Sequence, residues 1–332
     1  MSASCNNVFA VCLMVLSTVV LGQIQGRKTT AAIRSPEDNN HDRSYQGLYG
    51  NVRSVLTERK EIKTVFGKPK WGKREPSVAS TFDREGRETE RLVYAVRGFP
   101  TKTVNRYDTN GRLSVSESWG SNSQLIGTQT YEYAPDGRLR EITVSNGIRL
   151  QLEYDSEGRL KREYGTDTAT NEGPRFAPIP AVTEFRYDPK GRLLERANFN
   201  ADGSKSIGLA DVHRIVLSYD NPLGCAATSW LKADGTISLV NQIECFDPEK
   251  PKNPIEKFFY EPDGKLKSRL RIEYRFDGVG NWTKSITRRW NGTAWLPIVY
   301  EYRRIEYFPA ETASDERGKA MPRRKVDRAE TP

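Results

Sequence analysis

The chain has 332 residues, enough for one or two domains with a sizeable core, and its 52 basic and 43 acidic side chains give a formal net charge of +9. Apolar residues are only 36% of the sequence and charged residues 29%, which excludes a protein that crosses a membrane many times, while 15 Tyr, 12 Phe and 6 Trp argue against a disordered chain. Two His and four Cys leave little material for histidine-based catalysis or for zinc sites.

The first segment predicts a secretory signal. No charged side chain precedes Arg27, and the apolar stretch 8–22 is too short to span a bilayer comfortably. We expect residues 1–22 to be a cleaved signal peptide, with an uncleaved anchor as the alternative. Residues 23–45 are polar and predict a disordered linker, and residues 310–332 predict a disordered charged tail. The body of the protein is then residues 46–309.

One pattern recurs through this body: an aromatic residue, an acid, two variable residues, Gly, a base and Leu. Seven copies begin at Phe82, Tyr107, Tyr133, Tyr154, Tyr187, Tyr260 and Phe276. The acid and the Gly suit the first and fourth positions of a type I turn, in which the Gly takes a positive φ as the bulge residue of a hairpin. Each copy therefore predicts a β-hairpin.

The spacing also predicts which side chains meet in each hairpin. The aromatic residue faces the Leu, as in Tyr187 with Leu193 and Tyr260 with Leu266, and forms a core contact. The acid and the base are expected on the opposite face, where they form a charge pair. The residues given these structural roles are Tyr107, Gly111, Tyr133, Gly137, Tyr154, Gly158, Tyr187, Gly191, Tyr260 and Gly264.

This element resembles the YD-repeat or RHS (rearrangement hotspot) family over roughly residues 47–307. The resemblance implies hairpins joined into a long sheet that spirals, which large members close into a hollow shell around a toxin and which also occurs in surface proteins such as teneurins. We therefore predict an all-β fold of tandem β-hairpin (YD/RHS-type) repeats that form a long curved or spiralling antiparallel sheet. The segment after residue 309 is short and polar, so it is not expected to be an effector domain.

The sequence contains no recognisable catalytic constellation. His213 is the sole His of the body and is expected to be structural, and each repeat Asp already has a role in its turn. The turn at 233–235 places Cys225 and Cys245 on facing strands, where a disulfide is expected and buried free thiols are the alternative. We predict a noncatalytic protein without a cofactor or a metal site.

The most informative surface precedes the end of the body. Lys267, Arg269, Arg271 and Arg275 alternate with apolar residues along one strand, and Arg288 and Arg289 follow in the next segment among several Trp and Tyr residues. Basic and aromatic residues on one face suit an anionic polysaccharide or another envelope component, and no nucleic acid partner is expected. The alternative is a solvated face on which these bases pair with Glu273, Glu301 and Glu306.

Together these features predict an exported, noncatalytic scaffold or binding protein of the cell envelope or exterior, secreted, periplasmic or at the cell surface, that binds anionic glycans. Contact with a membrane is expected only through an uncleaved signal. The alternative function is a short or accessory member of an RHS-type toxin-delivery system that lacks its effector domain.

Overall fold

A computed structural model describes residues 43, 46–65, 68–94, 100–145, 147–167, 180–207, 211–219, 225–238, 241–250 and 252–309. The predicted signal, nearly all of the linker and the tail lie outside these residues. The strands are β1 (Val52–Val65), β2 (Lys68–Trp71), β3 (Glu75–Phe82), β4 (Glu88–Tyr94), β5 (Pro100–Tyr107), β6 (Leu113–Trp119), β7 (Leu125–Tyr133), β8 (Leu139–Val144), β9 (Ile148–Tyr154), β10 (Leu160–Asp167), β11 (Val182–Tyr187), β12 (Leu193–Phe199), β13 (Arg214–Ser218), β14 (Ala226–Leu231), β15 (Asn241–Phe246), β16 (Pro254–Tyr260), β17 (Leu266–Phe276), β18 (Trp282–Trp290) and β19 (Trp295–Tyr307).

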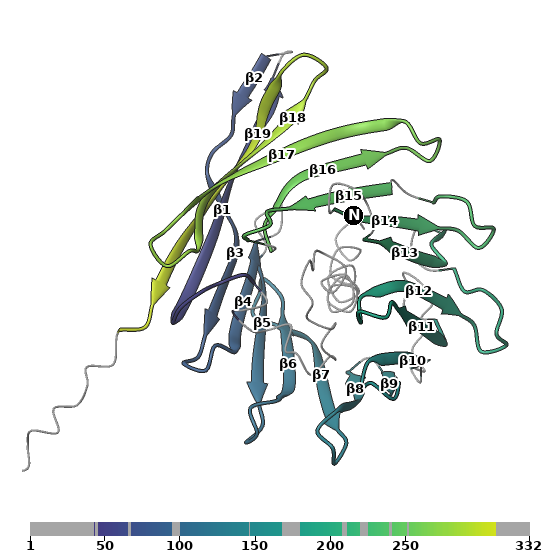
Figure 1. The fold of residues 1–332 in the computed structure, drawn as a ribbon. Helices are drawn as coiled ribbons and strands as arrows, with labels where there is room; N and C mark the ends of the chain where they lie inside the picture. Colours follow the sequence, from purple (N-terminus) through teal and green to yellow (C-terminus); the bar gives the residue numbers. More distant parts are fainter. Residues whose placement is uncertain are drawn as a thin grey trace, which may run out of the picture.

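The strands form a closed antiparallel barrel (Figure 1). Each strand from β3 to β19 pairs with its neighbours in chain order, and β1 pairs with both β3 and β19, so that Val55 lies between Ser80 and Ile305. The short strand β2 extends the end of β1 as a hairpin beyond this ring. The predicted long curved or spiralling sheet is therefore wrong, because the strands close into a barrel. Closure pairs the two edge strands, whose N–H and C=O groups an open sheet would leave without partners.

The hairpin turns have the predicted geometry. In the copy that begins at Tyr187, the Gly191 N–H donates to the Asp188 carbonyl at 2.9 Å, and Gly191 has a φ of 75°. Tyr187 lies opposite Leu193, and Tyr260 lies opposite Leu266, as predicted. The repeat glycines with positive φ are Gly86, Gly111, Gly137, Gly158, Gly191, Gly264 and Gly280.

Successive hairpins are joined by a recurring contact that we call the inter-repeat junction. The Tyr187 hydroxyl donates to the Leu160 carbonyl of the preceding hairpin at 2.8 Å, and the Arg159 guanidinium lies 5.1 Å from the centre of the Tyr187 ring. The same two contacts, a hydrogen bond from the hydroxyl and an Arg guanidinium beside the ring, join four other tyrosines to the hairpins that precede them. These are Tyr107, Tyr133, Tyr154 and Tyr219. Each junction thus links one copy of the repeat to the next.

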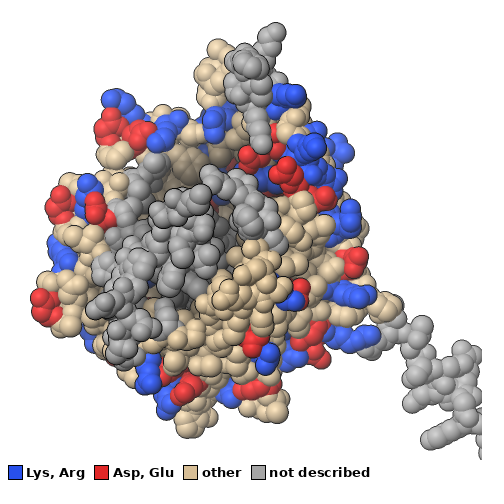
Figure 2. Space-filling view, turned by 180° about the vertical axis from the view of Figure 1, so that it is seen from behind, with Lys and Arg blue, Asp and Glu red and all other residues tan. Residues whose placement is uncertain are grey.

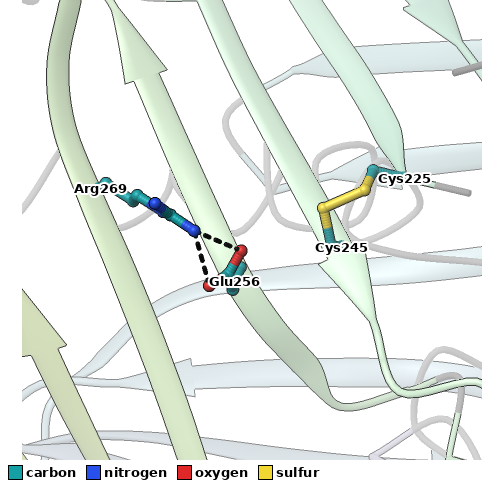
Figure 3. Close-up of a disulfide and its surroundings, with 4 residues drawn as sticks. All are labelled: Cys225, Cys245, Glu256 and Arg269. Atoms are coloured by element: carbon teal, nitrogen blue, oxygen red, sulfur yellow. Dashed lines mark hydrogen bonds and ion pairs between the residues drawn. A yellow bond between two sulfur atoms is a disulfide. The ribbon is translucent and has the colours of Figure 1, made fainter. Parts of the chain in front are cut away.

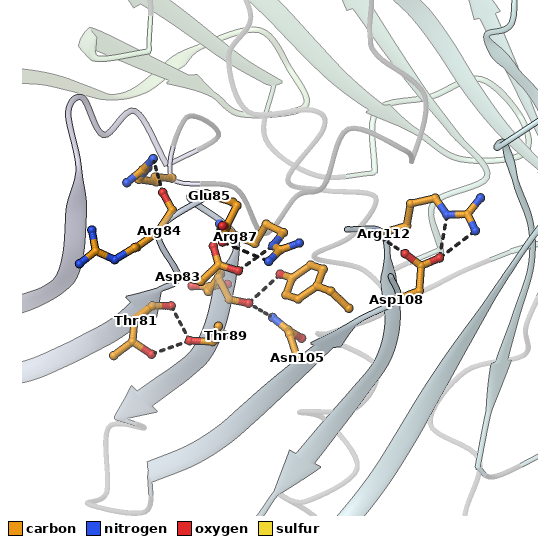
Figure 4. Close-up of polar contacts among 12 residues, drawn as sticks. Thr81, Asp83, Arg84, Glu85, Arg87, Thr89, Asn105, Asp108 and Arg112 are labelled. Atoms are coloured by element: carbon orange, nitrogen blue, oxygen red, sulfur yellow. Dashed lines mark hydrogen bonds and ion pairs between the residues drawn. The ribbon is translucent and has the colours of Figure 1, made fainter. Parts of the chain in front are cut away.

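The acid and the base of the repeat contribute to this junction. The Arg192 Nε donates to Asp188 Oδ2 at 2.6 Å, and the same guanidinium lies 4.5 Å from the centre of the Tyr219 ring. Figure 4 shows the corresponding pairs of Arg87 with Asp83 and of Arg112 with Asp108. The prediction that the charge pair lies on a separate face is wrong, because the paired guanidinium covers the aromatic ring of the next copy.

The core lies along the face of the sheet that holds the repeat Tyr and Leu side chains. One cluster contains Leu160, Phe185, Leu193, Ile215 and Leu217, each less than a tenth exposed, and Tyr187 and Tyr219 pack against it. A second cluster spans β8 and β9. The copy at Tyr260 differs, since its Leu266 is 50% exposed. That copy therefore has the predicted register without the predicted burial.

A second kind of contact closes the barrel beside the pairing of β1 with β19, and we call it the seam. Asn281 is fully buried; its Nδ2 donates to the Tyr49 carbonyl and to the Tyr307 hydroxyl, and its Oδ1 accepts from the Tyr49 N–H at 2.6 Å. The Tyr307 hydroxyl in turn donates to Asp277 Oδ2 at 2.5 Å. One side chain of the last copy thus holds both ends of the described barrel.

Candidate functional site

The predicted cations on β17 lie on the exposed face of the barrel, and each of the first three has a carboxylate partner. Lys267 pairs with Glu261 at 3.0 Å, while Arg269 and Arg271 share Glu256 at 3.2 and 3.1 Å. Figure 3 shows Arg269 reaching the Glu256 carboxylate. These ion pairs lower the net charge that this strand presents to a ligand.

The three other predicted cations are placed differently. Arg288 pairs with Glu273 at 3.1 Å, whereas Arg275 and Arg289 are exposed and have no ion-pair partner among the described residues. Glu301 and Glu306, expected as partners of these bases, accept hydrogen bonds from serines instead. Several of the predicted cations are thus paired, and others are open to solvent.

The structure adds aromatic rings to this face from neighbouring strands. Arg271 lies 4.5 Å from the centre of the Trp295 ring, and Arg269 lies between the rings of Phe258 and Trp295 at 5.1 and 5.2 Å. Phe258 lies opposite Arg269 in the register of β16 and β17, which places both on the exposed face. Cation and ring therefore hold each other in fixed positions.

The same arrangement continues across β18, β19, β1 and β2. Lys284 lies 5.1 Å from the centre of the Tyr300 ring, and Lys60 lies 5.5 Å from that of Trp71. The Trp71 and Tyr300 rings are themselves 4.6 Å apart. We call this surface the aromatic–cationic belt; it comprises Phe258, Trp295, Tyr300, Tyr302 and Trp71 with Lys60, Arg74, Arg269, Arg271 and Lys284.

The belt carries an excess of positive charge. Three of its five cations pair with two carboxylates of the described residues, namely Arg74 with Glu58, and Arg269 and Arg271 with Glu256. Figure 2 shows acidic and basic side chains side by side along the perimeter of the face that it views. The belt therefore combines partly exposed rings, positioned cations and local positive potential.

Part of the belt was not predicted from the sequence. Lys60, Trp71 and Arg74 lie far from the cations of β17 along the chain, and the pairing of β1 with β19 brings them together. The alternation of basic and apolar residues along β17 could not have identified them, because only barrel closure places β1 and β2 beside β19.

The predicted disulfide is present on the same side of the sheet. Cys225 and Cys245 are bonded, with their Cα atoms 4.2 Å apart, and both are buried. Their strands pair with Ala226 opposite Glu244, which puts the two Cys directly across from each other (Figure 3). The bond joins β14 to β15 next to the β16 strand that carries Phe258.

Charged groups also occur on the buried face. Burial raises the pKa of Glu163, against the attraction of Arg196, and burial lowers the pKa of Arg196, against the attraction of Glu163. Burial likewise lowers the pKa of Arg303 to about 10, and its guanidinium lies 3.7 Å from the centre of the Trp282 ring. Trp282 lies opposite Phe276, in the Leu position of its copy.

The lone His of the body is buried in the wall. His213 is 5% exposed, its Nδ1 lies 3.2 Å from the Ser206 carbonyl, and its ring meets Phe199 edge to face at 5.4 Å. Among the described residues, no group of three or more His, Cys, Asp or Glu side chains is placed to hold a metal ion. Within the same ranges, no helix is long and apolar enough to cross a membrane.

Comparison with known proteins gives limited overlap. No family model matches the chain. The double-stranded DNA deaminase toxin A of Burkholderia cenocepacia (strain H111) is 27% identical over an alignment of 205 residues, which covers 53% of this chain and only 14% of the toxin. The chain therefore corresponds to a small part of that protein's length.

Two solved structures align with much of this chain at low similarity. A porin-like protein from Bacteroides uniformis has a TM-score of 0.41 and 13% identity, covering 78% of this chain and 98% of that one. The TcdB2-TccC3-Cdc42 structure has a TM-score of 0.20 and 14% identity, covering 79% of this chain and 18% of that one. Neither overlap is close enough to support an argument about function.

Proposed function

We propose that the protein is an exported, noncatalytic YD/RHS-repeat barrel that binds anionic glycans on its aromatic–cationic belt. The observation that carries the proposal is the contact of five cations with five aromatic rings on one exposed face. A uronic or sulfated polysaccharide offers negative charge to the cations and apolar sugar faces to the rings. The continuous pairing of β16, β17, β18, β19 and β1 holds these side chains in place, which lowers the entropic cost of binding.

Two features support a location outside the cytoplasm. The disulfide between Cys225 and Cys245 is of the kind that persists in oxidising compartments, and the uncharged apolar segment 8–22 suits an export signal. The proposed site of action is therefore the cell envelope or exterior. Fractionation of the source cells, with mass spectrometry of the mature N-terminus, tests this part: an intact chain found only in the cytosol contradicts it.

The binding proposal is tested by titrating the protein with polygalacturonate and with dextran sulfate, using uncharged dextran as the ligand control. Affinity for both polyanions is expected to fall as salt rises from about 0.05 to about 0.5 M, because exposed charges are screened over shorter distances at higher ionic strength. Uncharged dextran should bind far more weakly. Polyanion binding that does not change with salt would remove the charge-based account.

A pair of variants locates the site. Arg271→Gln with Lys284→Gln removes two belt cations and is expected to weaken polyanion binding about tenfold. The matched control, Arg140→Gln with Lys161→Gln, removes two exposed and ion-paired cations on β8 and β10. Equal losses in both double variants would show that binding follows total charge, and the belt would then not be the site. Neutral substitutions are preferable to Arg269→Glu and Arg271→Glu, since acids there would face Glu256.

A second candidate function is a short or accessory part of an RHS-type toxin-delivery system without an effector domain. It is favoured by the repeat itself and by the partial similarity to a toxin. The genes beside the coding sequence distinguish this candidate from the first. An adjacent effector gene with an immunity gene supports delivery, and envelope or polysaccharide genes on both sides speak against it.

A further inference from the structure

A groove outside the belt lies over β4, β5 and β6. Its volume is about 470 Å³, and it is lined by Leu92, Lys102, Val104, Arg106, Glu117, Trp119, Gly120, Ser121 and Ser123. Sites for small molecules commonly have a volume in this range. In the register of the sheet, Lys102 lies opposite Trp119 and Val104 lies opposite Glu117, so these four side chains share the exposed face.

The turn at the end of this groove departs from the repeat. The Ser123 N–H donates to the Gly120 carbonyl at 3.0 Å, and the Gly120 N–H donates to the Gln124 carbonyl at 2.8 Å. Gly191 and Gly203 make the bond equivalent to that of the Ser123 N–H in their own turns, with φ of 75° and 79°. Ser123 adopts a φ of 59° in the same position. A serine is thus kept in a conformation that favours glycine, at a place where its side chain lines the groove.

Trp119 provides the aromatic surface of the groove. Its indole Nε1 is buried by the protein itself, so a ligand in the groove meets the ring and not the N–H. Leu92 and Val104 add apolar surface beside the ring.

The charges around the groove balance each other. Lys102 pairs with Glu90 at 2.6 Å, and Arg106 pairs with Glu117 at 2.9 Å. The two pairs offer hydrogen-bond donors and acceptors without net charge. This pattern suits a ligand whose hydroxyls both donate and accept, and whose ring has an apolar face for Trp119, Leu92 and Val104.

We propose that this groove binds an uncharged pyranose sugar, as a site separate from the belt. The Trp119 ring packs against the sugar face. Ser123 and the Arg106–Glu117 pair bond the hydroxyls at the other edge. The proposal does not depend on the proposed binding of polyanions.

The test uses the full chain and the methyl glycosides of glucose, galactose, mannose and N-acetylglucosamine, measured by saturation-transfer NMR and by titration. At least one of the four is expected to bind, with weak affinity. Trp119→Phe, which keeps a smaller aromatic ring, should weaken binding only about twofold. Trp119→Ala should abolish it, while Trp290→Phe on the far strand β18 should leave it unchanged.

Ser123→Gly separates a binding role from a structural one. Glycine accepts this backbone conformation more readily, so the variant should be at least as resistant to denaturant as the natural protein while its sugar affinity falls. Binding by none of the four glycosides, or equal binding by Trp119→Ala, overturns the proposal. So does Ser123→Gly with unchanged affinity. Belt variants such as Lys284→Gln should leave glycoside binding intact, which keeps this test independent of the belt.

Discussion

The inter-repeat junction and the seam use the same positions of the repeat in different ways. At a junction, the base Arg192 bonds Asp188 and covers the ring of Tyr219, whose hydroxyl bonds a carbonyl of the preceding hairpin. At the seam, Asn281 stands in the position of that base and bonds the backbone of Tyr49. A repeated contact can therefore join neighbours along the chain, whereas joining the two ends needs a departure from the repeat.

The largest effect is expected from breaking a junction. Tyr187→Ala removes a ring that packs against the core cluster, a hydroxyl bond to Leu160 and the partner of Arg159, and should lower the free energy of unfolding by about 3–5 kcal/mol. Tyr187→Phe removes only the hydroxyl bond and should cost about 1 kcal/mol. Urea unfolding of the two variants checks this ratio, and similar costs for both would show that ring packing contributes little.

Breaking the seam should lower the free energy of unfolding somewhat less than breaking a junction does. Asn281→Ala removes the partner of the Tyr49 N–H and C=O and of the Tyr307 hydroxyl, and should destabilise the protein by about 3 kcal/mol. Asn281→Arg restores the residue type of the other copies. It should be no more stable than Asn281→Ala, because only a short amide side chain can make these hydrogen bonds. Asn110→Ala, at an exposed turn position, is the matched control. If the consensus arginine stabilised the protein, the distinction between seam and junction would fail.

A smaller effect is expected at the turns, which both kinds of contact require. Gly191 has a φ of 75°, and Gly191→Val should cost about 2 kcal/mol because β-branched residues tolerate this conformation poorly. Lys190→Val, at the preceding position of the same turn, should cost much less. Thermal unfolding of both variants measures the difference, and equal shifts in Tm would contradict the turn assignment.

The change in stability with pH should be smaller than the effects of these substitutions. Burial tends to raise the pKa of Asp188, but the hydrogen bonds from the Arg192 backbone N–H and guanidinium outweigh it, and the pKa is lowered. Asp277 at the seam also has a lowered pKa, with burial opposed by bonds from Tyr307 and the turn N–H groups. A carboxyl with a lowered folded pKa stabilises the protein above its unfolded value of about 3.9 and loses that contribution as pH falls through the folded value.

Stability should therefore decline below about pH 4, and Asp188→Asn should flatten this decline while costing about 1 kcal/mol at neutral pH. Unfolding by urea at several pH values measures both quantities. An unchanged slope in Asp188→Asn would show that this carboxyl contributes nothing to the acid sensitivity.

Much of the local structure could be predicted from the sequence, because the determinants of each hairpin lie within one copy of the repeat. The Gly and acid positions specify the turn at Gly191, and residue parity specifies that Tyr187 faces Leu193. The junction could not be predicted, since it depends on how far one hairpin lies from the next. Closure could not be predicted either, because nothing in the spacing says that Val55 meets Ile305.

The candidate sites were predictable only in part for the same reason. Arg269 and Arg271 stand out by their alternation, but the carboxylate of Glu256 that pairs with both comes from another strand. Trp71 joins the belt through closure, and the groove at Trp119 depends on the left-handed φ of Ser123, which spacing does not reveal. Departures from the repeat, more than its copies, mark the places where function is proposed.

Hydrogen exchange at the amides of β1 and β19 is the clearest test of the closed barrel. Residues 54–57 of β1 pair with β3 on one side and with β19 on the other, so successive amides there should all exchange slowly. In an open sheet β1 would be an edge strand paired only with β3, and every second amide would point to solvent. Slow exchange at consecutive amides of β1 is the result that closure predicts. Alternating slow and fast exchange along β1, with the same alternation along β19, would contradict it.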